Sequence, residues 1–515
     1  MKRKVIRITA WTLGILAFIS IVASIALTLS LRGYVKQAVI RDLQQRFDST
    51  VEIRDISVLI VPRVYVMATG IVVRHQGRTD IPPLLTAERL DVSADLRVLI
   101  NSPHKVDRVE FEGLQVHIPP RDSESQAPPP SGQKHNFSVE IGEVTADDTT
   151  VVMMPKDPTK IPLEFDIHEL VMEGIGPGHP AAFHATLRNP KPVGDIQSDG
   201  EFGPWQADKP ALTPVQGKFS FSHADLATLK GISGILSSQG QYGGVLEKLD
   251  VTGDTDAPNF GLQFSGKPVD LKTHYIAEVD GTNGNTYLKS VTARFLSSTV
   301  ETSGEVVKVR DSKHREISLS ARVPKGRIED MLHLVINSDQ PIMTGSVNLN
   351  TKIEIPAAGP ENVFDRLILD GKFDIADAHF TSSSIQEKVD ALSRRGQGEP
   401  KNENIEDVIS NLQGRFVLKD RVATFTNLAF DVEGAKVQLA GSYNLESQDL
   451  DFSGHLLLKA KLSKLVSGKK SIFLKPFDPI FEKNGAGTSV PIKITGSRAN
   501  PSFGLDLHGK DKKSN

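Results

Sequence analysis

Apolar and polar residues alternate along most of the chain, and this alternation is the main signal of its fold. From Val51 onward, segments such as VEIRDISVLI, VYVMATGIVVRH, FEGLQVHI and FSVEIGEVTA place apolar residues mostly at every second position. Turn-forming Pro, Gly and Asp residues separate these segments. Such alternation gives a β-strand one apolar face. The pattern therefore predicts a mainly β protein built on a long antiparallel sheet.

A short motif recurs within these segments, with Gly followed by apolar residues at the second and fourth places. It occurs as GKFSF at 217, GEVVK at 304, GSVNL at 345, GKFDI at 371, GRFVL at 414 and GSYNL at 441. The irregular spacing shows that these are not copies of one domain. A glycine supplies the turn or bulge conformation at a strand entry. We expect roughly fifteen to twenty strands in all.

The start of the chain has a different pattern, because residues 9–31 form one apolar run without a charge. A run of this length can cross a bilayer core as a helix. Four basic residues within 1–8 precede it, so the positive-inside rule places the N-terminus in the cytoplasm and exports the remainder. The anchor residues are Trp11, Leu13, Ile15, Leu16, Phe18, Ile19, Ile21, Val22, Ile25, Leu27 and Leu29. A cleaved signal peptide is the alternative, but SIALTLSLRGYV is a poor cleavage site.

Helical periodicity appears in four short segments. Val35, Val39, Leu43 and Phe47 predict one apolar stripe just after the run, which lies either on lipid or on the first strands. The segment SSSIQEKVDALSRR has Ser384 and Glu387 at capping-box spacing, with Ile385, Val389 and Leu392 on one face. RIEDMLHLVI, with Ile328, Met331, Leu332 and Val335 on one face, and HADLATLKGISGIL are weaker candidates. The last three of these helices are expected to plug or cap the sheet.

Composition divides the chain into modules. The predicted parts are a cytoplasmic basic segment (1–8), a transmembrane helix (9–31), an N-terminal β module (32–118), a Pro-rich linker (119–136), a middle β module with short helices (137–393), a charged loop (394–407), a C-terminal β region (408–508) and a basic tail (509–515).

The 515 residues offer little catalytic chemistry. The chain has no cysteine, which excludes a disulfide, a thiol nucleophile and a Cys-based zinc site. No stretch interleaves basic and aromatic residues, and the formal charge of -3 gives no electrostatic footprint for a nucleic acid. The 14 histidines show no metal-ligand spacing, and adjacent acids such as Asp147 and Asp148 are typical turn formers. We therefore predict no enzyme activity, no cofactor and no metal.

Both ends of the chain resemble a known family. The run GRFVLKDRVATFTNLAFDVEGAKVQLAGSYNLESQDLDFSGHLLLKAKLSKLVSG from Gly414, with the later GAGTSVPIKITGS and NPSFGLDL, is similar to the C-terminal region of the AsmA-like family. The basic start, the single apolar run and DSTVEIRDISVLIVPRVYVMATGIVVRH resemble that family's beginning. The middle, about 137 to 380, resembles the family only in its general pattern of alternating strands.

The resemblance implies a single-pass protein of the bacterial inner membrane whose bulk is periplasmic. It also implies a long, curved sheet forming an elongated groove, as in the related bridge-like lipid-transfer proteins. The function implied is phospholipid movement toward the outer membrane in support of outer-membrane assembly. An outer-membrane or periplasmic protein is a possible partner. The family has no catalytic motif to transfer.

The alternation supplies candidate lipid contacts in the C-terminal region: Phe416, Leu418, Leu428, Phe430, Val432, Val437, Leu439, Tyr443 and Leu445. The same alternation would be expected if these residues filled the interior of a closed sandwich, whose facing sheets lie about 10 Å apart. Two functions stay open at this point. One is a carrier that shields acyl chains, and the other is a scaffold for outer-membrane proteins that carries no lipid.

Overall fold

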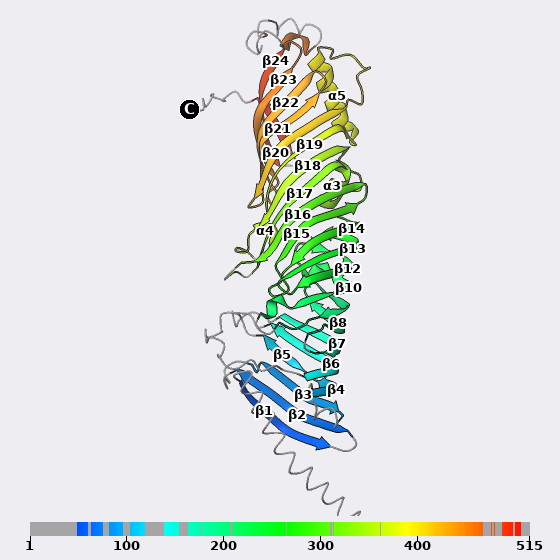
Figure 1. Ribbon diagram of the computed structural model, residues 1–515. Helices are drawn as coiled ribbons and strands as arrows, with labels where there is room; N and C mark the ends of the chain where they lie inside the picture. The colour runs from blue at the N-terminus through cyan, green and yellow to red at the C-terminus, as the bar shows by residue number, and fades with distance from the viewer. Residues whose placement is uncertain are drawn as a thin grey trace, which may run out of the picture. The chain divides into compact units, whose positions relative to one another are not determined.

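The computed structural model describes residues 49–59, 63–75, 82–95, 104–118, 139–153, 163–176, 178–206, 209–263, 265–309, 312, 314–360, 362–466, 475, 478, 487–497 and 500–505. These residues form 25 β-strands and a few short helices (Figure 1). The prediction of a mainly β protein is therefore confirmed. The strands outnumber the expected fifteen to twenty.

The chain divides into two compact units. Unit 1 comprises residues 1–224 and 241–246, and unit 2 comprises residues 225–240 and 247–515. The division falls inside the range 137–393 that the sequence predicts as one module.

Unit 1 contains the first ten strands and the end of β12 (Ile235–Val245). They are β1 (Ser49–Leu59), β2 (Val64–His75), β3 (Leu85–Ala94), β4 (His104–Glu112), β5 (Gln115–Ile118), β6 (Val139–Met153), β7 (Leu163–Ile175), β8 (Ala181–Pro190), β9 (Val193–Phe202) and β10 (Pro214–Asp225). A 3₁₀ turn, η2 (Pro210–Leu212), precedes β10. Val51, Ile53, Ile56, Ala68, Ile71 and Ala87 form a buried cluster on β1 to β3.

The sheet is mixed, which corrects the prediction of a purely antiparallel one. β4 and β5 both pair with β3 in antiparallel fashion and with β6 in parallel. A parallel pair needs a crossover of about a dozen residues or more. The predicted linker region between β5 and β6 supplies the necessary length of chain.

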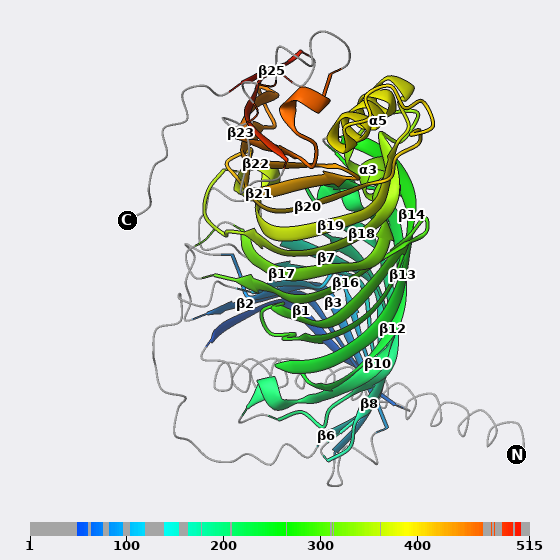
Figure 2. The ribbon, with the colours of Figure 1, turned by 90° about the horizontal axis from the view of Figure 1, so that it is seen from above.

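Unit 2 is an antiparallel meander from β13 onward, with each strand paired to the next. Figure 2 shows β14 to β19 bending in an arc. Its strands are β11 (Ile232–Ser233), β13 (Lys248–Leu262), β14 (Ser265–Val279), β15 (Thr286–Phe295), β16 (Ser298–Lys308), β17 (Arg315–Arg327), β18 (Met343–Ile355), β19 (Ile368–Phe380), β20 (Ser410–Lys419), β21 (Val422–Val432), β22 (Ala435–Asn444), β23 (Asp449–Leu458), β24 (Thr488–Ser497) and β25 (Pro501–Leu505).

Within the part of unit 2 that the structure describes, three α-helices interrupt this meander at its strand ends: α3 (Ile328–Val335), α4 (Val363–Arg366) and α5 (Ser383–Gln397). Helix α3 is the predicted RIEDMLHLVI helix, although Val335 is 44% exposed and only part of the predicted face is covered. The prediction of a helix in HADLATLKGISGIL was wrong. That segment holds the end of β10, the 3₁₀ turn η3 (Leu226–Thr228), β11 and the start of β12.

Helix α5 differs from its prediction in two details. Its N-cap is Ser382, without a side-chain cap hydrogen bond, so the capping box at Ser384 and Glu387 does not form. The helix also continues through Gln397, which makes the start of the predicted charged loop 394–407 helical. The 3₁₀ turn η4 (Leu462–Lys464) follows β23.

Several predictions fall outside the described residues. They are the basic segment 1–8, the apolar run 9–31 with its anchor residues, the stripe at Val35 to Phe47, the linker 119–136 and the tail 509–515. Among the helices that the structure does describe, none has the length and apolar character needed to span a membrane.

Candidate functional site

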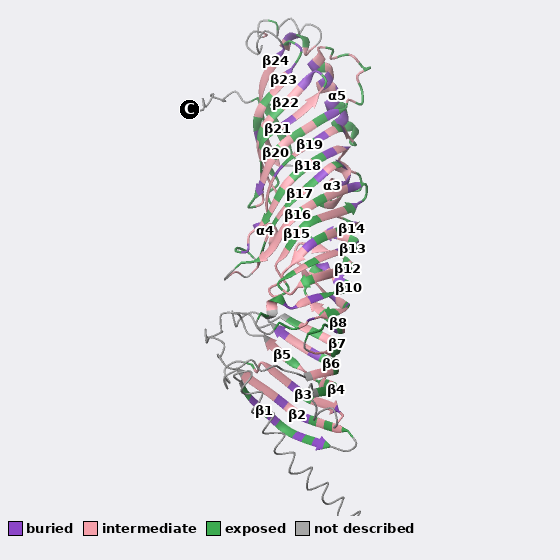
Figure 3. Cartoon of the chain, viewed as in Figure 1, coloured by how far each residue is buried: buried purple, intermediate pink, exposed green. Residues whose placement is uncertain are grey.

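One face of the unit 2 sheet is apolar over β19 to β24, and we call it the apolar face. Exposure alternates along these strands, as the banding in Figure 3 shows. The apolar face consists of Leu369, Phe373, Ile375, Leu412, Phe416, Leu418, Phe425, Leu428, Phe430, Val432, Val437, Leu439, Tyr443, Leu450, Phe452, Leu456, Val490, Ile492 and Ile494.

Strand register makes this face continuous. Phe430 on β21 stands opposite Leu412 on β20 and Val437 on β22, and Val437 in turn stands opposite Leu456 on β23. Because directly opposed side chains in a sheet contact each other, apolar contacts run across the strands as well as along them. Leu456 pairs onward with Val490 on β24.

Aromatic rings form a second row on the same face. The ring centroids of Phe373 and Phe416 lie 6.2 Å apart, those of Phe416 and Phe425 6.4 Å, and those of Phe425 and Phe452 5.8 Å. These separations are typical of tilted aromatic contacts. Gly371 pairs with Phe416, and Gly414 with Phe373. The recurring Gly motif thus leaves space on one strand for an aromatic ring from the next.

The depth of burial varies across the apolar face. Val323, Val347, Ile375 and Ala378 form a fully buried cluster, onto which Ile328 and Met331 of α3 pack. Most large side chains on β20 to β22 are only half-buried. The interior of a closed sandwich would bury such residues fully. Full burial is seen where α3 packs on the sheet.

The nine predicted lipid contacts all lie in this region. Eight are half-buried: Phe416, Leu428, Phe430, Val432, Val437, Leu439, Tyr443 and Leu445. Leu418 is buried, at 8% exposure. Leu445 follows directly after β22, and its backbone N–H donates to the carbonyl of Arg421 at 2.9 Å.

Several members of the face were not predicted from the sequence, notably Phe373, Phe425, Phe452 and Ile492. Phe425 was not predicted because a β-bulge lies between Phe425 and Leu428. The bulge moves the apolar face from odd to even positions of the strand. The other three follow regular alternation next to strands that were recognised, so the same period would have found them.

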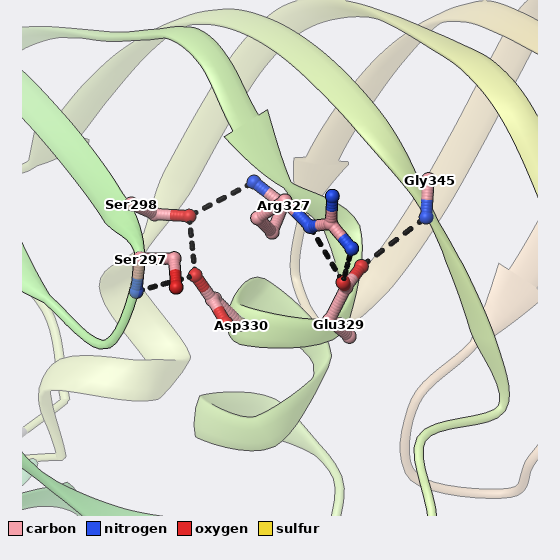
Figure 4. Close-up of polar contacts among 6 residues, drawn as sticks. All are labelled: Ser297, Ser298, Arg327, Glu329, Asp330 and Gly345. Carbon is pink, nitrogen blue, oxygen red and sulfur yellow. Dashed lines mark hydrogen bonds and ion pairs between the residues drawn. The ribbon is translucent and has the colours of Figure 1, made fainter.

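Helix α3 is held over one edge of this surface by a polar network (Figure 4). The Asp330 carboxylate accepts from the Ser297 backbone N–H at 3.0 Å and from the Ser298 hydroxyl at 2.7 Å. The Glu329 carboxylate accepts from the Arg327 guanidinium at 2.7 Å and from the Gly345 N–H at 3.2 Å. The network ties α3 to the start of β16 and to β18.

Cross-strand ion pairs dominate the opposite face on β13 and β14. Asp254 contacts His274 at 2.8 Å, and Asp256 contacts Lys272 at 3.9 Å. Asp147 and Asp148 lie on β6, where Asp148 has a positive φ of 48° that is typical of a local irregularity. Among the described residues, no group of three or more His, Asp or Glu side chains is placed to hold a metal ion.

No known protein-family profile, curated protein or solved structure matches this chain.

Proposed function

We propose that the protein binds phospholipid through the apolar face and conducts it toward the outer membrane. In this proposal, residues 9–31 anchor the chain in the inner membrane, the N-terminus is cytoplasmic and the two β units are periplasmic. The resemblance of both chain ends to the AsmA-like family supports this assignment. The proposal gives no residue a catalytic role.

The observation that carries the proposal is the half-burial of large apolar side chains on β20 to β22. An apolar surface left partly open to water has a free-energy cost of about 25 cal/mol per Å². Contiguous apolar patches on soluble proteins commonly mark binding sites. An acyl chain lying on Phe416, Phe430 and Leu439 would remove this surface from water.

The energetics of the ligand favour the same conclusion. Moving an acyl chain of about sixteen carbons into water costs roughly 13 kcal/mol, at about 0.8 kcal/mol per methylene. A carrier must offset most of this cost along the whole path. The strand register extends the apolar face from β19 to β24 without a charged side chain on it.

A matched pair of variants on β21 tests the proposal. Phe430→Asp places a charge on the apolar face, whereas Thr424→Asp places the same charge on the exposed side of the same strand. The full chain is extracted in mild detergent, and uptake of a fluorescent phosphatidylethanolamine is measured on native gels. We expect Phe430→Asp to lose most of the uptake and Thr424→Asp to keep the parent level. Circular dichroism and resistance to proteolysis check that both variants fold.

Lipid held around the anchor is the same in all three proteins, so the difference between the variants reports on the apolar face. Equal uptake by folded Phe430→Asp and Thr424→Asp would contradict the proposal. That result, together with a specific crosslinked protein partner unaffected by Phe430→Asp, would favour a scaffold that carries no lipid.

A further inference from the structure

A hollow of about 850 Å³ lies on β15 to β20 of unit 2 and is lined largely by side chains on the polar side of the sheet. Its lining includes five basic side chains, and we call it the basic hollow: Lys289, Arg322, Lys352, Lys372 and Arg415. Only two acidic side chains, Glu301 and Asp370, accompany them. The whole chain carries a formal charge of -3, so this excess of positive charge is local.

Strand register places these charges side by side. Arg322 stands opposite Asn350, Asn350 opposite Lys372, and Lys372 opposite Arg415. Glu301 also stands opposite Arg322, and Asp370 opposite Lys352. Like charges directly opposite each other destabilise a sheet. At the Lys372–Arg415 pair, Asp370 offsets this repulsion for Arg415 alone, at 3.3 Å.

Two of the five cations are already neutralised within the sheet. Lys289 contacts Asp250 at 3.0 Å and Glu278 at 3.1 Å, and these hydrogen bonds raise its pKa. Arg415 contacts Asp370 at 3.3 Å. Within the described chain, the side chains of Arg322, Lys352 and Lys372 have no hydrogen-bond or ion-pair partner.

The neighbouring strands β13 and β14 pair their lysines with acidic side chains. On β13 and β14, Lys272 pairs with Asp256, and Lys248 with Glu278 at 3.5 Å. The same polar side of the sheet thus balances its charges in one region and leaves cations unpaired in another. The unpaired ones surround a hollow whose lining also offers the hydroxyls of Ser303 and Ser320.

We propose that the basic hollow binds a phosphate-bearing polyanion, with Arg322, Lys352 and Lys372 as its charged contacts. Arg presents a planar fork that matches phosphate oxygens, and Lys contributes a compact point charge. The Asn350 amide and the two hydroxyls can donate to the remaining oxygens. The volume accommodates more than one phosphate group. This site lies among polar side chains and does not depend on lipid binding by the apolar face.

Titration with sodium tripolyphosphate tests the proposal, using the full chain in phosphatidylcholine nanodiscs and isothermal calorimetry. We expect saturable binding that weakens as salt increases, because exposed charge pairs are screened. Arg322→Gln and Lys372→Gln should each raise Kd about tenfold, since a charge-assisted hydrogen bond contributes about 1.5 kcal/mol or more. Lys272→Gln, on the same side of the sheet but outside the hollow, is the matched control and should leave Kd unchanged.

A second arm separates a lipid headgroup from a soluble anion. The same nanodiscs are floated with vesicles of phosphatidylcholine alone, or of phosphatidylcholine and phosphatidylglycerol in equal parts. Flotation that needs phosphatidylglycerol and is lost in Arg322→Gln/Lys372→Gln assigns the site to a headgroup. Tripolyphosphate binding without such flotation assigns it to a soluble phosphate compound. Absence of both, or tripolyphosphate binding undiminished in the double variant, overturns the proposal.

Discussion

Phe425 on β21 and Phe452 on β23 meet across the intervening strand β22, with ring centroids 5.8 Å apart. The residue between them is Gly441, which pairs with Phe425 on one side and Phe452 on the other. Because glycine has no side chain, the two rings close over it. This contact joins strands that share no hydrogen bonds, and it makes the apolar face continuous at this point.

Gly441→Ala should therefore be strongly destabilising. An alanine Cβ at this position would clash with the carbonyl oxygen of Asp451 and would lie 2.9 Å from Cδ1 of Phe452. Relieving such contacts needs backbone movement, at a cost of about 1–3 kcal/mol in the free energy of unfolding. Urea denaturation followed by circular dichroism measures it. The control is Gly504→Ala on β25, where an added Cβ has no atom within 4 Å. Equal free energies of unfolding for the two variants would show that the fold does not need a residue without a side chain at position 441.

Photo-crosslinking should reproduce the two-residue period of the sheet. With a benzophenone amino acid at Leu428 or Leu439, both half-buried on the apolar face, we expect ultraviolet light to attach phospholipid to the protein. The same amino acid at Asn427 or Gln438, the adjacent exposed positions, should attach little. Mass spectrometry of the digested protein identifies the adducts. Similar adduct levels at all four positions would mean that lipid does not distinguish the two faces.

Loss of the Asp330 carboxylate should loosen helix α3. Asp330→Ala leaves the Ser297 N–H and the Ser298 hydroxyl without this acceptor in a buried setting, which costs about 1–3 kcal/mol. We expect faster amide hydrogen exchange in residues 328–335, because the helix has only two turns and depends on this anchorage. Glu387→Ala, at an exposed position of α5, should leave exchange in α3 unchanged. Unaltered exchange in the Asp330 variant would mean that apolar packing alone holds the helix.

The strands were predictable because alternation is a local property. Phe430, Val437 and Leu439 were assigned correctly to strands with one apolar face, since each stands two positions from the next apolar residue. The expected fifteen to twenty strands were too few, since the described residues form 25. The turn between β20 and β21 contains neither Gly nor Pro, and Asp420 and Arg421 both have positive φ there, a conformation in which Asp is enriched.

Tertiary contacts explain what could not be predicted. Helix α5 buries Gln386, Asp390 and Ser393, while the predicted face residue Ile385 is 38% exposed. Gln386 bonds to the backbone of Phe380 and Val408, partners that come from elsewhere in the chain. Likewise, periodicity cannot tell an open apolar face from a closed interior, because both require the same alternation. The difference appears only in how deeply the side chains are buried.

Ionisation of Tyr275 should lower the stability of the fold at alkaline pH. Its hydroxyl lies 3.2 Å from that of Ser238, and burial raises the pKa of the phenol above its ordinary value of 10.0. Above pH 10 the unfolded chain loses this proton while the folded chain keeps it, so stability falls as pH rises from the unfolded pKa toward the folded one. Thermal unfolding of the parent should therefore show a declining Tm through this window, and Tyr275→Phe should show a shallower decline despite its lost hydrogen bond. Identical slopes for the two proteins would mean that ionisation of Tyr275 is not linked to folding.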